Sequence, residues 1–300
     1  MKKNYPRIIL IIALACAITS LAVFLHYAQI GEPHPQPQPP VIEPPAADMI
    51  PDAETEETSQ DSDAVPVMLE RFSELYEQNE DLVGWIRVPN TVIDYPIVYC
   101  SDNAYYLKHN FSKKQSAGGA PFLDSSADML EKNQNLSLYA HYMKNGSMFT
   151  ALHNYKDFEY YKAYPLFEFD SLYEESLYKI FSVFYMAGNH TDEYFYYYPT
   201  AHFTSDDAFM EHVNQLLTRS IFVTGIDVAA GDQLVLMTVC TYETDNLRLV
   251  VAGRKIRPGE SIVVDTEKAS INQEPLYPKK WYRKFGGEPV DFVEKYAKIN

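Results

Sequence analysis

Three side chains have the types and positions needed for thiol-based acyl transfer. Cys240 ends the strand-like run QLVLMTVC, where a thiol is expected to be partly exposed beside the polar loop TYETDN. Arg248 opens the next strand-like run, LRLVVAGRKI. If the two runs are adjacent strands, the guanidinium faces the thiol, favours its ionised form and offers donors to an oxyanion. His141 ends a further run, NLSLYAH, and can serve as general acid and base for a thiolate.

Each of these residues has a simpler interpretation when it is taken alone. A single cysteine in a β-run is usually a buried, inert packing residue. An arginine at the start of a strand is often a surface charge, and a histidine before a turn such as that at 144–146 is more often structural. Their joint occurrence at strand ends favours a cysteine nucleophile with two partners, and therefore an enzyme.

Four segments resemble the sortases, specifically those of class B: GWIRVPNTVIDYPIV, DNAYYLKHNF, NLSLYAHYMKNGSMF and LVLMTVCTYETDNLRLVVAGRKI. The resemblance covers residues 68 to 258, with the motifs in family order. It implies a mainly β fold, an eight-stranded barrel with peripheral helices behind an N-terminal transmembrane helix. It also implies that His141, Cys240 and Arg248 are the catalytic residues.

The resemblance implies a definite reaction. A sortase cleaves the C-terminal sorting signal of a secreted protein at a Thr-Gly or Thr-Asn type of bond, forms a thioester, and transfers the product to an amine. The acceptor is a cell-wall peptidoglycan precursor or a pilin amine, and no cofactor or metal is expected. Three alternatives stay open: a class B sortase that assembles pili, a cysteine endopeptidase that releases its product to water, and a non-catalytic surface scaffold.

Further residues are candidates for contact with the sorting signal. Two match family contact positions, one lies in the loop YFYYYPTAHF, one precedes the cysteine by two residues, and one lies in the loop after it. These are Asn103, Leu107, Tyr198, Thr238 and Glu243. Ordinary barrel packing is the alternative for the tyrosine, and a solvated turn carboxylate is the alternative for the glutamate. Family members usually have a second hydroxyl residue at the position of Val239, and a glycine at that of Ala140.

The elements that must position these residues are mostly strands. Short runs rich in β-branched and aromatic residues, separated by polar turns, predict strands. Apolar residues at helical spacing predict a helix at 68–76 and an amphipathic helix at 206–220. The predicted strands are 91–99, 135–142, 177–186, 232–242 and 247–256.

The N-terminal region predicts a single-pass membrane protein. Residues 8–25 carry no charge, and at about 1.5 Å per residue they span roughly 27 Å. Lys2, Lys3 and Arg7 precede this run, so the N-terminus is expected in the cytoplasm and the remainder outside. A cleaved signal peptide is the main alternative, and a lipid-modified Cys16 is another.

Composition divides the rest of the chain. We expect a cytoplasmic stub and anchor at 1–30, a proline-rich and acidic linker at 31–65, a catalytic domain at 66–262 and an extension of undetermined order at 263–300. The net charge of −16 argues against nucleic acid as a partner. Three cysteines do not make a disulfide framework. Cys100 is interpreted as a packing residue, with a redox partnership to the catalytic thiol as the alternative.

Overall fold

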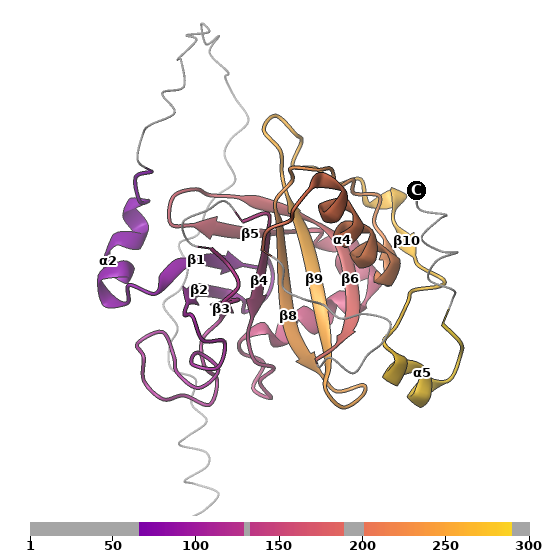
Figure 1. The fold of residues 1–300 in the computed structure, drawn as a ribbon, viewed down its shortest axis with the longest axis horizontal. Coiled ribbons are helices and arrows are strands. Elements are labelled where there is room, and N and C mark those ends of the chain that lie inside the picture. The colour runs from indigo at the N-terminus through magenta and orange to yellow at the C-terminus, as the bar shows by residue number, and fades with distance from the viewer. Residues whose placement is uncertain (1–65, 129–132, 189–200, 290–300) are drawn as a thin grey trace, which may run out of the picture. The chain divides into compact units, whose positions relative to one another are not determined.

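The computed structural model describes residues 66–128, 133–188 and 201–289 (Figure 1). They belong to one compact unit, Asp63–Asn300. Within these residues, no helix has both the length and the apolar character needed to cross a membrane. The anchor expected at 8–25, the linker expected at 31–65 and the candidate Tyr198 all lie outside the described residues.

In the described part of the chain, eight strands close into a barrel in the order β1-β2-β3-β4-β8-β9-β6-β5. The pairs β2–β3 and β4–β8 are parallel, and the other neighbours are antiparallel. The prediction of an eight-stranded barrel is confirmed. The strands are β1 (Leu82–Arg87), β2 (Asp94–Tyr99), β3 (Phe122–Leu123), β4 (Asn135–Tyr139), β5 (Leu166–Ser171), β6 (Leu177–Ala187), β8 (Leu234–Thr241) and β9 (Leu247–Lys255).

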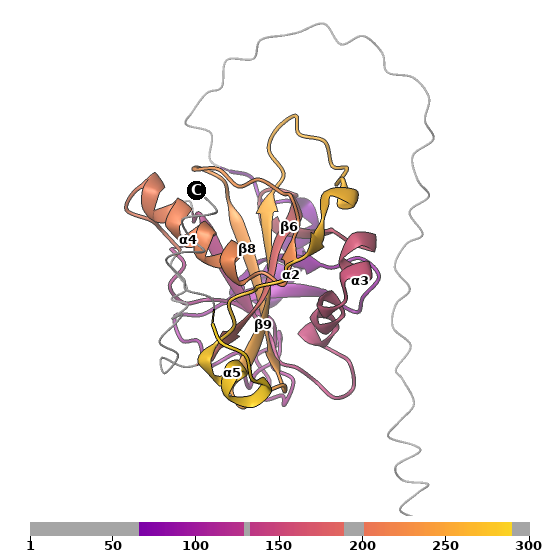
Figure 2. The same ribbon diagram turned by 90° about the vertical axis from the view of Figure 1, so that its right-hand side faces the viewer.

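Helices lie outside this barrel. The predicted N-terminal helix is α2 (Glu70–Gln78), and the predicted amphipathic helix is α4 (Asp206–Arg219). Ser205 caps α4 through a hydrogen bond from the amide of Ala208, as is usual for serine at this position. The connection from β4 to β5 contains η1 (Phe149–Lys156) and α3 (Phe158–Ala163). Figure 2 shows α4 and α3 on opposite sides of the strands β6, β8 and β9.

Alternation along β8 decides which residues face the barrel interior. Val235, Met237 and Val239 belong to the interior cluster, while Leu234 and Leu236 pack under α4 on the outer face. Successive side chains of a strand point to opposite faces. Residues 238 and 240 therefore continue the outer face beyond the part that α4 covers.

The described residues after β9, which end at residue 289, pack against the barrel domain. It carries η2 (Thr266–Lys268), β10 (Ser270–Ile271) and α5 (Lys279–Phe285). The strand β10 pairs with β7 (Phe222–Val223), which follows α4. Sequence reasoning left the order of this extension open, and these contacts show that its described part packs against the domain.

Candidate active site

Cys240 is the next-to-last residue of β8, and it is where that strand reaches the surface. The six residues Leu234–Val239 before it are all buried, whereas the side chain of Cys240 is partly exposed. Its thiol is free, as is that of Cys100, which packs beside Val98 and Tyr106. The exposure is what a nucleophile needs to meet a substrate.

Arg248 lies directly opposite Cys240 in the β8–β9 pair, as the sequence predicted. Its Nη1 donates a hydrogen bond to the Cys240 Sγ over 3.6 Å. Gly188, just after β6, makes room for the side chains of Asn246 and Arg248, because a Cβ there would stand 2.8 Å from the Arg248 Nε and still closer to the Asn246 Oδ1. In the sequence, the only indication of this role of Gly188 is its place at the end of a strand-like run.

His141 follows β4 and shares a register position with Cys240. Tyr139 pairs with Thr238 in the parallel β4–β8 ladder, so His141 and Cys240 each stand two residues beyond that pair. The His141 Nε2 lies 2.9 Å from the carbonyl oxygen of Leu107. The ring is thus held by the segment 103–118.

Asn103 and Leu107 lie in the segment between β2 and β3. The amide of Asn103 donates to the Asp124 carboxylate over 3.0 Å and accepts from the Ser125 amide over 2.8 Å. Asn103 therefore fixes its own loop in this structure. Leu107 packs partly buried against the cluster around Tyr106, and its carbonyl orients His141. The structure brings Leu107 to the site and uses the Asn103 side chain for loop structure.

Thr238 shares the outer face of β8 with Cys240 but is almost completely buried, at 1% exposure. Its hydroxyl oxygen has no hydrogen-bond partner among the described residues. A buried hydroxyl without a partner costs about 1–3 kcal/mol. The position is thus next to the nucleophile, as predicted, with a hydroxyl that is closed to solvent.

Glu243 lies in the loop 242–246 between β8 and β9, and its carboxylate is engaged within the protein. It accepts hydrogen bonds from the Lys156 ammonium and from the Thr241 hydroxyl. Burial opposes ionisation of Glu243, but these hydrogen bonds outweigh it, so the pKa of the carboxyl is lowered. The alternative interpretation of Glu243 as a solvated turn carboxylate is therefore wrong, since its side chain ties the loop to η1 through Lys156.

The extension after β9 reaches the same loop. Trp281 of α5 stacks on Tyr277 with ring centroids 4.2 Å apart, and it also lies 4.8 Å from the ring of Tyr185 in β6. Lys280 and Lys284 donate to backbone carbonyls of the loop 242–246. The loop is therefore held by residues of both η1 and α5, and the polar sequence of the extension did not reveal the second of these contacts.

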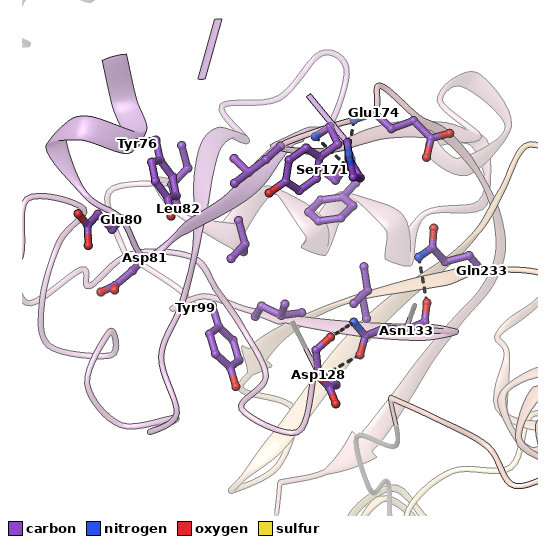
Figure 3. A pocket seen from close by; sticks show the side chains of 17 residues that line it. Tyr76, Glu80, Asp81, Leu82, Tyr99, Asp128, Asn133, Ser171, Glu174 and Gln233 are labelled. Atoms are coloured by element: carbon purple, nitrogen blue, oxygen red, sulfur yellow. Dashed lines mark hydrogen bonds between the residues drawn. The ribbon is translucent and has the colours of Figure 1, made fainter. Parts of the chain in front are cut away.

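A pocket of about 690 Å³ lies elsewhere on the barrel (Figure 3). Its lining includes Tyr76, Asp81, Tyr99 and Gln233. Gln233 precedes β8, whereas Cys240 stands near the end of that strand. The pocket is thus at the opposite end of β8, and none of its lining residues belongs to the site around Cys240.

Comparison with known proteins places the chain in a family. No protein-family model matches it. It is 31% identical to sortase B of Listeria monocytogenes over 191 residues, which is 62% of this chain and 74% of that protein. A structure of sortase B from B. anthracis in complex with AAEK2 is 33% identical with a TM-score of 0.58, covering 68% of this chain and 89% of the other. Sortase B of Clostridium perfringens is 28% identical with a TM-score of 0.57, covering 61% of this chain and 98% of the other.

This chain therefore belongs to the sortases, a family whose members are cysteine transpeptidases. Within them it belongs to class B, as the segments around the cysteine and histidine suggested.

Proposed function

We propose that Cys240 is the nucleophile of a transpeptidase, with Arg248 as the stabiliser of the oxyanion and His141 as general acid and base. The observation that carries this proposal is the guanidinium placed 3.6 Å from a partly exposed thiol by direct pairing of β8 and β9. Hydrogen bonds from charged donors are stronger than neutral ones and suit a developing negative charge.

The proposed reaction has two steps, formation of a thioester and its transfer to an amine. The thiolate of Cys240 attacks the carbonyl carbon of the scissile bond, a C–S bond forms, and the oxyanion accepts hydrogen bonds from Arg248. Collapse of this intermediate breaks the C–N bond, and the leaving amine takes a proton from His141. In the second step an acceptor amine gives a proton to His141, attacks the thioester carbon and releases the thiolate.

The orientation of His141 supports its proton-transfer role. A carbonyl oxygen only accepts, so the contact with Leu107 requires a proton on the His141 Nε2. This leaves Nδ1 as the nitrogen that gains and loses a proton while the ring stays tethered. A segment that contacts the substrate would in this way also hold the acid–base residue in place.

The substrate in this proposal is the C-terminal sorting signal of a secreted protein, cut at a Thr-Gly or Thr-Asn type of bond. Support comes from the family, in which one structure is described as a Staphylococcus aureus sortase B–substrate complex. We assign the peptide contacts to Leu107 and Tyr198, and not to Thr238, whose hydroxyl is closed to solvent. Asn103 and Glu243 act on the substrate through the loops that they hold, since their side chains are engaged internally.

The proposal also assigns a location and an acceptor. Residues 8–25 anchor the protein with its N-terminus in the cytoplasm, and the linker at 31–65 holds the catalytic domain outside the membrane. The acceptor is an amine of a cell-wall peptidoglycan precursor, so that the enzyme anchors surface proteins. A pilin lysine in the same role would make the protein a pilus-assembling enzyme.

A peptide-library cleavage assay on the purified full-length chain in detergent tests this function. Cleavage of peptides after threonine, with a ligated product that requires an added amine, is the expected result. Product released to water alone, whatever the amine, would identify a cysteine endopeptidase instead. Cys240→Ala is the control, and cleavage that survives this substitution ends the proposal.

A further inference from the structure

The backbone of Cys240 lies just beyond the point where β8 loses its neighbour β4. Among the described residues, the last backbone hydrogen bond to this stretch of β8 from the end of β4 comes from the Ala140 amide, one residue after β4, and reaches the Thr238 carbonyl over 3.4 Å. Carbonyls two residues apart in a strand point the same way. The carbonyl of Cys240 therefore points toward β4, at the level where that chain has turned away into the segment after His141.

His153 of η1 takes the place of the missing strand. Its Nε2 lies 3.0 Å from the carbonyl oxygen of Cys240. Because that oxygen can only accept, Nε2 carries the proton, and in the neutral ring Nδ1 is then an acceptor. The Lys156 Nζ stands 3.4 Å from Nδ1 and can donate to it. The ring thus links a lysine to the backbone of the nucleophile.

The remaining donors of Lys156 fit the same arrangement. Its ammonium donates to the Thr241 hydroxyl over 3.1 Å and to the carboxylate of Glu243. An ammonium group has three donors, and the three acceptors here match them. Burial and the neighbouring positive charge of Lys156 lower the pKa of His153, although hydrogen bonding to the Cys240 carbonyl and the charge of Glu243 oppose this. The ring is therefore neutral, as the hydrogen-bond pattern requires.

We propose that His153 is a positioning residue that extends the hydrogen-bonded ladder of β8 by one residue and fixes Cys240 opposite Arg248, with Lys156 selecting the tautomer that can do so. The proposal rests on the function proposed for Cys240. A nucleophile misplaced by about 1 Å can lose about a hundredfold in rate, so a single backbone bond at this residue matters. His153 does not touch the substrate in this scheme.

The test compares three variants of the full-length chain. His153→Leu removes the ring, His153→Gln keeps a side-chain donor, and Lys156→Met removes the partner that selects the tautomer. Lys179→Met is a matched control, because Lys179 is a buried lysine paired with Glu260 at a distance from this network. Two readouts are taken at one pH: the rate of alkylation of Cys240 by iodoacetamide, and kcat and KM with a sorting peptide.

We expect His153→Leu to lower kcat and the alkylation rate about tenfold or more, with KM within about threefold of the parent. His153→Gln should recover most of this loss, and a long-range 1H–15N spectrum should show the Nε2-protonated ring of His153 in the parent and not in Lys156→Met. Parental rates in His153→Leu, or equal losses in the Leu and Gln variants, would overturn the proposal. If His153→Leu does not fold, the Gln and Lys156→Met variants decide through the same rates.

Alkylation needs no sorting substrate, so the two proposals can fail separately. A parent enzyme that does not process any peptide would refute the proposed function. The alkylation rates of the variants would still decide whether His153 positions the thiol.

Discussion

Replacing Arg248 by methionine removes the positive charge that the β8–β9 pair places beside Cys240. The two side chains are joined by a contact of 3.6 Å from Nη1 to Sγ, and both are partly exposed. For a guanidinium and a thiolate at this distance, Coulomb's law gives an attraction of about 1.2 kcal/mol in water and about 4.6 kcal/mol at an effective dielectric constant of about 20. Because both side chains are partly exposed, the attraction lost on substitution lies between these values. Removal of an oxyanion donor typically lowers kcat by a factor of about 10²–10³.

We therefore expect Arg248→Met to lower kcat/KM for a sorting peptide by about a hundredfold or more, with unchanged thermal stability. Arg248→Lys retains the charge without the planar guanidinium, so its kcat/KM should lie between those of Arg248→Met and the parent. Arg87→Met is the matched control, since Arg87 is also a half-exposed arginine of a barrel strand, paired with Glu168 over 2.9 Å. If Arg248→Met keeps kcat/KM within about threefold of the parent, the reasoning from charge and distance is refuted.

Three further predictions concern the residues around this site and the stability of the domain. Gly188→Ala should displace the side chains of Asn246 and Arg248, because the new Cβ would stand 2.8 Å from the Arg248 Nε and still closer to the Asn246 Oδ1, and it should lower kcat/KM about tenfold. Gly118→Ala, with contacts of 3.7 Å and more, should leave kcat/KM unchanged. Burial lowers the pKa of His212 to about 4, so the unfolded chain takes up its proton first and stability is lost as the pH falls from 6.5 to about 4. Urea unfolding should show that His212 lowers the free energy of unfolding by about 2 kcal/mol at pH 5. His212→Gln should remove this contribution to the pH dependence of the unfolding free energy, and an unchanged pH dependence would contradict the lowered pKa. Trp281→Ala should lower the melting temperature by an amount equivalent to about 2 kcal/mol, and an unchanged value would show that α5 does not stabilise the domain.

The β8–β9 pair shows how far local sequence determines the site. Two strand-like runs joined by a short polar loop can pair in few ways, so the facing positions of Cys240 and Arg248 followed from spacing alone. The helix α4 was equally clear because its apolar residues recur at helical spacing. The strand β1 was not predicted, since LVGWIR directly follows the helix α2 and forms its ladders with β2 and β5.

Contacts that depend on distant backbone could not be predicted in this way. The bond from His153 to the Cys240 carbonyl exists because β4 ends where η1 passes, and no periodicity in the sequence encodes that meeting. Glu243 was judged by its loop alone, and its partner Lys156 is 87 residues away. The extension around α5 is polar and basic, and its contact with the barrel is made by Trp281, which packs on Tyr185 of β6 and on Tyr277 of the extension itself.

The most direct test of the account is to trap the acyl-enzyme. The full-length chain is incubated with a sorting peptide without an amine acceptor, denatured in acid, digested and analysed by mass spectrometry. The account predicts an added acyl mass on the peptide that contains Cys240, which hydroxylamine removes and which Cys240→Ala does not form. An acyl group on another residue, or cleavage of the peptide by Cys240→Ala, would contradict it.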